Sequence, residues 1–284
     1  MNILITGCNG FVARNLATYL SKNHTIISTN RSTLDALNEE EVSLFLGNNN
    51  VDIVIHTAVS GGRRGKKDEF SVLVDNLKMF DNFKKNKEKY KYLFHFGSGA
   101  EFDRRQNIIC ASEKIPSSPV DYYGLSKKII KTEIDKIEGF YNFRLFGCFG
   151  EGEDDARFVK SVITNINNNK PVVIHQNKIM DYVYVGDVVR VIEYYIENIP
   201  KKTLINDINI CYNKKHSLIE IAQYLINISG KECKIVINQQ GLSNEYTGNG
   251  DNMQSLDIEL DGLWDSMKKV YNHLMREDNV CKIK

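Results

Sequence analysis

The chain has 284 residues, 42% of them hydrophobic and 26% charged, an ordinary globular composition with room for one large α/β domain and a smaller lobe. Its formal net charge of +1, with acidic and basic residues interspersed, excludes the broad positive surface of a nucleic-acid-binding protein. No apolar run reaches the roughly 18 residues of a membrane span and the chain starts directly in a strand pattern, so we expect a cytoplasmic protein that binds no membrane.

Strand-length apolar runs alternate with stretches of helical periodicity through the first half of the chain. Some of these runs are continuously apolar, which is typical of parallel strands buried on both faces. Repeated strand–helix units therefore predict a doubly wound parallel sheet with helices on both sides. The runs lie at residues 2–6, 25–28, 51–56, 92–96 and 142–146.

After residue 150 this alternation loosens. We predict an α/β fold in two parts: a sheet domain of residues 1–152, which residues 187–212 rejoin, and a smaller C-terminal lobe of residues 153–186 and 213–284. The expected helices of the second half lie at 156–167, 187–196 and 218–228, and its short strands at 171–174, 182–185 and 208–211.

A glycine-rich turn joins the first expected strand to the helix after it. Residues 6–13 read Thr-Gly-Cys-Asn-Gly-Phe-Val-Ala. The first glycine permits a sharp turn, the second lets a pyrophosphate approach the backbone, and the alanine allows close helix-to-sheet packing. Because a helix N-terminus favours an anion, the pattern predicts that residues 1–152 form a Rossmann-like dinucleotide-binding domain. Its predicted contacts from this turn are Gly7, Asn9, Gly10, Phe11 and Val12.

The end of the second strand indicates which dinucleotide binds. Proteins that bind NAD place an acidic residue there to hold the ribose, whereas a basic residue accepts the 2′-phosphate of NADP. Here residues 28–32 read Ser-Thr-Asn-Arg-Ser, and no acid comes before Asp35. Arg31 therefore favours NADP(H), and NAD(H) stays an alternative.

Three polar side chains mark a candidate catalytic site. Tyr123 and Lys127 lie four residues apart on an expected helix that begins near Val120, so both face the same side. The ammonium is expected to lower the pKa of the phenol, so that Tyr123 exchanges a proton with an alcohol or carbonyl. Ser98 directly follows the fourth strand, at the edge where ligands bind in open α/β sheets.

The cysteines and histidines show no metal-binding pattern. The six cysteines contain no Cys-x-x-Cys, and no two of the six histidines are four residues apart. We therefore expect free thiols and no metal site.

Together these motifs resemble the extended short-chain dehydrogenase/reductase family, the NAD(P)-dependent epimerase/dehydratase group, over nearly the whole chain. Residues 52–58 are similar to the third strand of that family, and residues 181–187 to its substrate-lobe segment. The length and residues 30–35 look most like the branch of GDP-L-fucose synthases and dTDP-4-dehydrorhamnose reductases. The resemblance adds Ala58 and Asn76 to the expected cofactor contacts and assigns substrate binding to the smaller lobe.

The resemblance also implies roles for the three polar residues. Tyr123 would protonate a carbonyl oxygen as hydride leaves the nicotinamide, and Ser98 would hydrogen-bond the same oxygen. Lys127 would hold the nicotinamide ribose and tune Tyr123. The family members are often homodimers that pack through two helices, and we expect the same here.

Departures from the family pattern narrow the reaction. Sugar 4,6-dehydratases carry an Asp-Glu pair after the serine or threonine, where this chain has Gly99 and Ala100. GDP-fucose synthases epimerise ring carbons with a cysteine and a histidine, and the matching positions here are Ala100 and Arg157, neither of which shuttles protons. Both departures favour simple ketoreduction.

The expected substrate contacts are Gly99, Ala100, Arg157 and Lys160. The family commonly has an arginine for the substrate diphosphate before Asp181, where this chain has Met180. Arg157, Lys160 or Lys178 would replace that contact, and Arg63 and Arg64 would reach an acidic substrate.

The sequence thus predicts an NADPH-dependent ketoreductase that acts at C4 of a nucleotide-activated keto-deoxy-sugar in surface-polysaccharide sugar biosynthesis. An NAD-dependent nucleotide-sugar 4-epimerase is the alternative that uses the same three residues. A non-catalytic dinucleotide-binding sensor is the alternative of another class.

Overall fold

A computed structural model describes residues 1–62 and 65–281, with only the backbone of 277–281. The chain divides into two compact units. Unit 1 consists of residues 1–105, 113–145 and 193–209, and unit 2 of residues 106–112, 146–192 and 210–284.

Unit 1 is built around a six-stranded sheet in the order β10-β6-β4-β3-β1-β2. Four pairs of neighbouring strands run parallel: β2 with β1, β1 with β3, β3 with β4, and β4 with β6. Chain order reverses beside β1, so the carboxyl ends of β1 and β3 form the switch point where open α/β sheets bind ligands. The strands are β1 (Asn2–Thr6), β2 (Thr25–Thr29), β3 (Ile53–His56), β4 (Tyr92–Ser98), β6 (Phe140–Leu145) and β10 (Asp207–Ile210).

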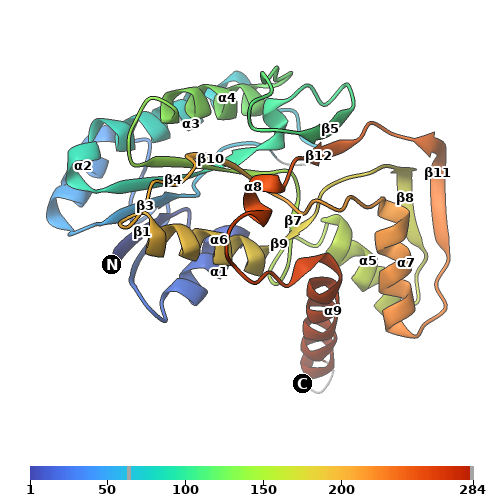
Figure 1. Ribbon diagram of the computed structural model, residues 1–284. Helices are drawn as coiled ribbons and strands as arrows, with labels where there is room; N and C mark the ends of the chain where they lie inside the picture. The colour runs from blue at the N-terminus through green and yellow to red at the C-terminus, as the bar shows by residue number, and fades with distance from the viewer. Residues whose placement is uncertain (63–64, 282–284) are drawn as a thin grey trace. The chain divides into compact units, whose positions relative to one another are not determined.

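Helices cover both faces of this sheet (Figure 1). On one face, Leu4 of β1 packs in a buried cluster with Val42, Phe80 and Ile130, which come from α2 (Glu39–Asn48), α3 (Phe70–Lys85) and α4 (Tyr122–Ile134). On the other face, α1 (Phe11–Leu20) contacts β1 and β2. Strands buried from both sides require apolar side chains on both faces, which explains the continuous runs in the sequence.

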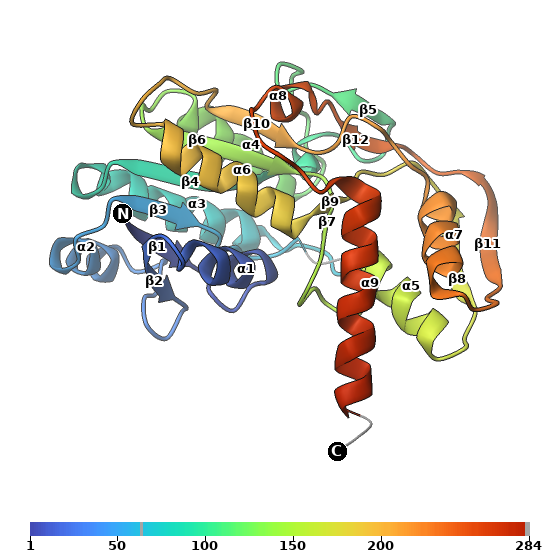
Figure 2. The same ribbon diagram turned by 60° about the horizontal axis from the view of Figure 1, so that its bottom comes forward.

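Unit 2 is organised by helices and short strand pairs. Its buried cluster joins β8 (Val172–Asn177) to α5 (Phe158–Asn167), α7 (Leu218–Ser229) and α9 (Gly262–Cys281), and Figure 2 shows α7 beside β8 and β11 (Ile235–Leu242). The pairs are β8 with β11, β7 (Cys148–Phe149) with β9 (Val183–Tyr184), and β5 (Ile108–Ala111) with β12 (Tyr246–Gly248). α8 (Asp251–Gln254) is a single turn.

Local signals in the sequence set the helix ends. Asp121 begins α4 by accepting the Gly124 N–H at 2.7 Å. Ser217 and Glu220 form a capping box that begins α7, and Gly230 ends that helix with φ +65°. The side chains of Asp121, Ser217 and Glu220 and the backbone N–H of Gly230 satisfy groups that a helix terminus leaves unpaired.

The predicted α/β class is confirmed, and the unit boundaries differ from the predicted ones. β1 spans the predicted residues 2–6, and the helix predicted at 187–196 is α6 (Val185–Asn198). Residues 106–112 belong to unit 2 because β5 pairs there with β12, a partner far along the chain. Residues 146–152, 187–192 and 210–212, expected in the sheet domain, also belong to unit 2.

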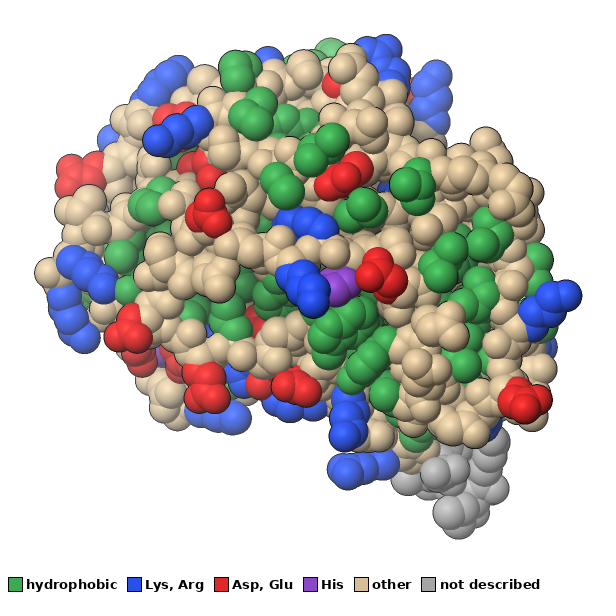
Figure 3. Space-filling view, turned by 45° about the vertical axis from the view of Figure 1, so that its right-hand side comes forward, with side chains coloured by type: hydrophobic (Ala, Val, Ile, Leu, Met, Phe, Trp, Pro, Cys, Tyr) green, Lys and Arg blue, Asp and Glu red, His purple; other side chains and the backbone are tan. Residues whose placement is uncertain are grey.

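The surface carries mixed charge. Positive and negative side chains lie interspersed on the face shown in Figure 3, as the net charge of +1 leads one to expect. Within the described residues, no helix combines the length and apolar character that a membrane span requires.

Candidate active site

The glycine turn between β1 and α1 has a backbone shape that side chains would prevent. Gly7 has φ +65°, and a β-carbon on it would lie 2.8 Å from the Cα of Ala58. The turn is closed by the Gly10 N–H, which donates to the Gly7 carbonyl at 2.9 Å. Gly10 is the N-cap of α1 and supplies no capping side chain, so the first amides of this helix are open to an anion.

Asn9 and Gly10 are exposed in this turn, while Phe11 and Val12 are half-buried at the start of α1. At the end of β2, the Arg31 side chain is 80% exposed, and its Nε lies 3.5 Å from a carboxylate oxygen of Asp35. A guanidinium held this loosely is accessible to a phosphate.

Asn76 of α3 is buried and acts as a clamp. Its amide oxygen accepts the Ser60 N–H at 2.8 Å, and its amide nitrogen donates to the Ser60 carbonyl at 3.0 Å and to Ser126 Oγ at 3.1 Å. The clamp ties the loop after β3 to α4, one turn from Tyr123. Asn76 was predicted from the sequence as a cofactor contact. The structure gives it a positioning role, and direct contact with a cofactor stays a prediction.

The structure brings Ser98, Tyr123 and Lys127 together in unit 1. Lys127 Nζ lies 5.6 Å from the centre of the Tyr123 ring and donates to the Phe96 carbonyl at 2.7 Å. Ser98 ends β4, and its side chain lies close enough to Tyr123 to lower the pKa of the phenol. Gly124 lets α4 approach the turn after Ser98, since a β-carbon on Gly124 would clash with the Ala100 carbonyl.

Burial governs the protonation of this group. It lowers the pKa of Lys127 to about 8, against the opposing charge of Glu101. It raises the pKa of Tyr123, which the Ser98 side chain lowers and the Glu101 charge raises further. The pKa of Tyr123 therefore shifts in the direction opposite to the sequence-based expectation, because desolvation of the phenolate is the largest effect on it.

The sequence does not predict two features of this group, one beside Tyr123 and one beside Lys127. A β-carbon on Gly62, which has φ +69°, would lie 2.8 Å from the Tyr123 ring, so the loop after β3 covers the ring closely. Beneath Lys127, His95 Nε2 lies 3.4 Å from Nζ, and burial holds the pKa of this histidine well below its usual range. Neither a loop glycine nor a strand histidine carries a local sequence signal for such a position.

The predicted substrate contacts are divided between the units. Gly99 and Ala100 are buried in unit 1, in the short helical turn η2 (Gly99–Glu101) that follows Ser98. Arg157 and Lys160 belong to unit 2. Arg157 is exposed and donates to the Cys148 carbonyl at 3.2 Å.

Lys160 is held by protein acceptors. Its Nζ donates to the Glu153 carbonyl at 3.0 Å and lies 2.6 Å from an Asp155 carboxylate oxygen. Arg63 and Arg64, also considered for an acidic substrate, lie outside the described residues. All four predicted substrate contacts stay predictions.

Comparison with known proteins identifies the family. The model of the NAD dependent epimerase/dehydratase family matches residues 3–211. The chain belongs to this family. No curated protein sequence matches the chain.

Solved structures show the same fold at low sequence identity. A GDP-6-OMe-4-keto-L-xylo-heptose reductase from Campylobacter jejuni is 19% identical with a TM-score of 0.80, covering 97% of this chain and 98% of its own. A dTDP-4-dehydrorhamnose reductase from Bacillus anthracis, in complex with NADP, is 15% identical with a TM-score of 0.81, covering 96% and 98%. A UDP-glucose 4-epimerase from Thermotoga maritima is 18% identical with a TM-score of 0.81, covering 98% and 99%.

The residues of this family member fit the dinucleotide that the family name implies. The turn at Gly7 and Gly10 is a cradle that β-carbons would crowd, and it presents the bare N-terminus of α1. A pyrophosphate is the kind of ligand that such amides and the helix dipole favour. Gly7, Asn9 and Gly10 would hold it, and Lys127 and Arg31 offer cations for the ribose and the 2′ group.

Proposed function

We propose that this epimerase/dehydratase family member is an NADPH-dependent ketoreductase acting at C4 of a nucleotide-activated keto-deoxy-sugar. The observation that carries the proposal is the grouping of Ser98, Tyr123 and Lys127 where β4 ends, in the unit that holds the glycine turn. The fold likeness to two nucleotide-sugar ketoreductases supports it. Arg31 supports NADPH over NADH as the cofactor.

The chain's own residues would supply the proton and the positioning. NADPH supplies the hydride when bound. The raised pKa of Tyr123 keeps its phenol protonated near neutral pH, so that it donates a proton to the carbonyl oxygen. The Ser98 hydroxyl would hydrogen-bond the same oxygen, and Lys127 would hold the cofactor ribose. Addition of one hydride to carbon and one proton to oxygen yields the alcohol.

The protonation of Tyr123 also bears on the rival reaction. A 4-epimerase first removes a proton from the C4 hydroxyl, which requires a deprotonated base, whereas a reductase starts from an acid. Burial and the Glu101 charge both favour the acid form. The UDP-glucose 4-epimerase shares the fold, so the behaviour of the cofactor has to decide between the two reactions.

Cofactor titration followed by turnover tests the proposal. We expect tighter binding of NADPH than of NADH, a thermal shift with one of GDP, UDP, dTDP or CDP, and oxidation of one NADPH per keto-sugar reduced. Tyr123→Phe should bind NADPH normally and lower kcat by roughly 10²- to 10⁴-fold. Co-purified NAD without net turnover would point to the epimerase, and NADPH binding without turnover of any keto-sugar to the sensor.

We also infer a homodimer that packs through α3 and α4. Large apolar side chains lie exposed on these two neighbouring helices, and the rings of Phe70 and Tyr122 meet edge-on with centres 5.5 Å apart. Exposed apolar surface of this kind marks an interaction site. The exposed residues are Phe70, Val74, Tyr122 and Ile129.

A further inference from the structure

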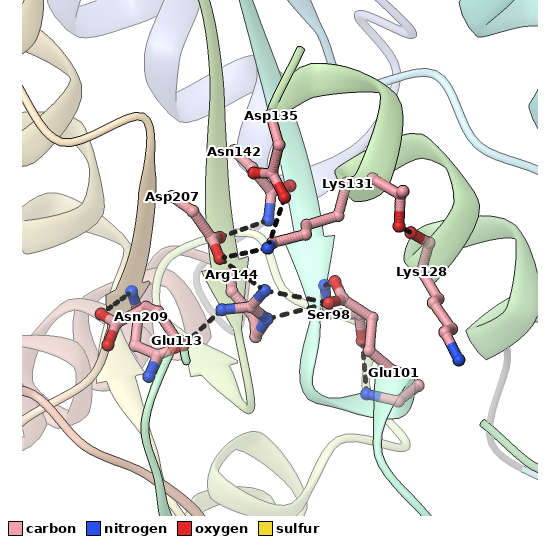
Figure 4. A network of polar contacts seen from close by, with 12 residues as sticks. Ser98, Glu101, Glu113, Lys128, Lys131, Asp135, Asn142, Arg144, Asp207 and Asn209 are labelled. Carbon is pink, nitrogen blue, oxygen red and sulfur yellow. Dashed lines mark hydrogen bonds and ion pairs between the residues drawn. The ribbon is translucent and has the colours of Figure 1, made fainter. Parts of the chain in front are cut away.

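A buried charged network lies against the turn that carries Ser98 (Figure 4). At its centre is Arg144 of β6, whose side chain is 2% exposed. Its Nε and Nη2 donate to one carboxylate oxygen of Glu101 at 3.1 and 3.0 Å. Nη2 also donates to Asp207 at 3.0 Å, and Nη1 donates to Asn209 at 2.9 Å. All these residues belong to unit 1.

Glu101 connects this network to Ser98. Its second carboxylate oxygen accepts the Ser98 N–H at 3.2 Å, while Ser98 Oγ accepts the Ala100 N–H at 3.2 Å. The two bonds form a capping box around η2. The end of β4, and with it the Ser98 hydroxyl, is therefore held by a carboxylate that is itself held by a guanidinium.

Capping of the turn η2 does not by itself explain why residue 101 is a glutamate, which carries a charge. A glutamine caps as well as a glutamate at an exposed helix start, and burial of a carboxylate costs free energy that its partners must offset. Glu101, however, accepts hydrogen bonds on both oxygens, from Arg144 on one and from Ser98 on the other. A glutamine has one acceptor oxygen and so serves only one of these donors.

The charge of Glu101 also reaches the catalytic group. It raises the pKa of Tyr123 and opposes the lowering of the Lys127 pKa that burial causes. Arg104 lowers and Asp68 raises the pKa of Tyr123, and the Lys127 ammonium lies 5.6 Å from the centre of the Tyr123 ring. His95 lies against Lys127 and His56 stacks on the His95 ring, and burial lowers the pKa of both histidines, so they are neutral.

We propose that Glu101 is a positioning residue for carbonyl reduction, which holds Ser98 through its backbone N–H and carries a negative charge on the turn that packs against the helix of Tyr123. The inference rests on the proposed ketoreductase function. Arg144 is the anchor that orients Glu101, and its charge opposes the rise in the Glu101 pKa that burial causes.

Asp207 provides a matched control for Glu101. It is a second buried carboxylate on the same guanidinium, but its other contacts run to Asn142 at 2.8 Å and to Lys131 at 3.5 Å, away from the Ser98 turn. Glu101→Gln and Asp207→Asn therefore each remove one negative charge beside Arg144. Both should lower the Tm, and only Glu101→Gln should disturb Ser98.

In steady-state kinetics, we expect Glu101→Gln to lower kcat by roughly 10- to 100-fold with little change in KM. Loss of the negative charge lowers the pKa of Tyr123, so the alkaline limb of the kcat profile should move to lower pH. Asp207→Asn should keep kcat within about threefold of wild type and leave that limb in place. Equal effects of the two substitutions on kcat and on the alkaline limb would overturn the proposal.

Glu101→Asp decides the question if Glu101→Gln does not fold. The shorter carboxylate keeps its charge beside Arg144 but withdraws from the Ser98 N–H, so kcat should fall while the alkaline limb stays near that of wild type. A wild-type kcat in this variant would count against positioning.

Amide hydrogen exchange at Ser98, followed by NMR, separates this inference from the proposed function. Exchange should be slow in the wild type and in Asp207→Asn and faster in Glu101→Gln. If the wild type reduces no keto-sugar, the function fails while this measurement still tests the Glu101 contact. Unchanged exchange in Glu101→Gln would refute that contact whatever the activity.

Discussion

At the scale of the residue, backbone conformation decides where a side chain is tolerated. Gly7 and Gly230 share a φ of +65°, a region that L-residues adopt at a cost of roughly 1–2 kcal/mol. They differ in surroundings, since a β-carbon on Gly7 meets the backbone of Ala58 and one on Gly230 meets nothing within 4 Å. A comparison of substitutions at Gly7 and Gly230 can therefore separate the cost of backbone strain from the cost of steric crowding.

We predict that Gly7→Ala lowers the free energy of unfolding by more than Gly230→Ala, which should lose only about 1 kcal/mol. Gly7→Ala should also weaken NADPH binding at least tenfold, because Ala58 must move away from the phosphate turn. Denaturant unfolding and fluorescence titration with NADPH measure the two effects. Equal losses in stability and unchanged NADPH affinity would contradict the cradle assigned to this turn.

At the scale of the element, buried asparagines of α3 fasten loops to the helix layer. Asn76 holds the loop after β3 and reaches Ser126 of α4, whereas Asn82 donates to the Ala36 carbonyl at 2.8 Å. Both side chains are buried on one helix, and only Asn76 adjoins the segment that carries Tyr123.

Substitution by aspartate removes the amide donors and leaves a buried carbonyl facing a carboxylate. We predict that Asn76→Asp and Asn82→Asp each destabilise the protein by roughly 1–3 kcal/mol. Asn76→Asp alone should also reduce kcat/KM, since the loop over the Tyr123 ring is released. Thermal unfolding and turnover of both variants test this, and an equal loss of kcat/KM in Asn82→Asp would rule out a specific clamp.

The sequence predicts features that depend on residues close together in the chain, and it misses features that depend on distant segments. The strand at 2–6, the glycine turn and the grouping of Tyr123 with Lys127 depend on neighbouring residues, and the structure has them. The pairing of β5 with β12 joins segments far apart in the chain, so no local pattern reveals it. Arg144 was a missed signal, because a charge inside a strand buried on both faces requires a buried acid.

At the scale of the whole molecule, the remaining question is how copies of the chain associate. The exposed face of α3 and α4 bears Phe70, which is 58% exposed, at the start of one helix and Ile129 on the other. Covering apolar side chains of this size stabilises association by roughly 25 cal/mol per Å² buried, before the entropic cost of binding. A charge placed in their midst would remain unpaired in an interface.

We therefore predict that Phe70→Glu converts a dimer of about twice 32.5 kDa into a monomer. Leu44→Glu is the control, because Leu44 is equally exposed on α2, a helix that carries none of the four residues of the proposed interface, and its substitution should leave the dimer intact. Light scattering after size exclusion measures the mass of each variant. A monomeric wild type, or dissociation by Leu44→Glu alone, would show that α3 and α4 do not form the interface.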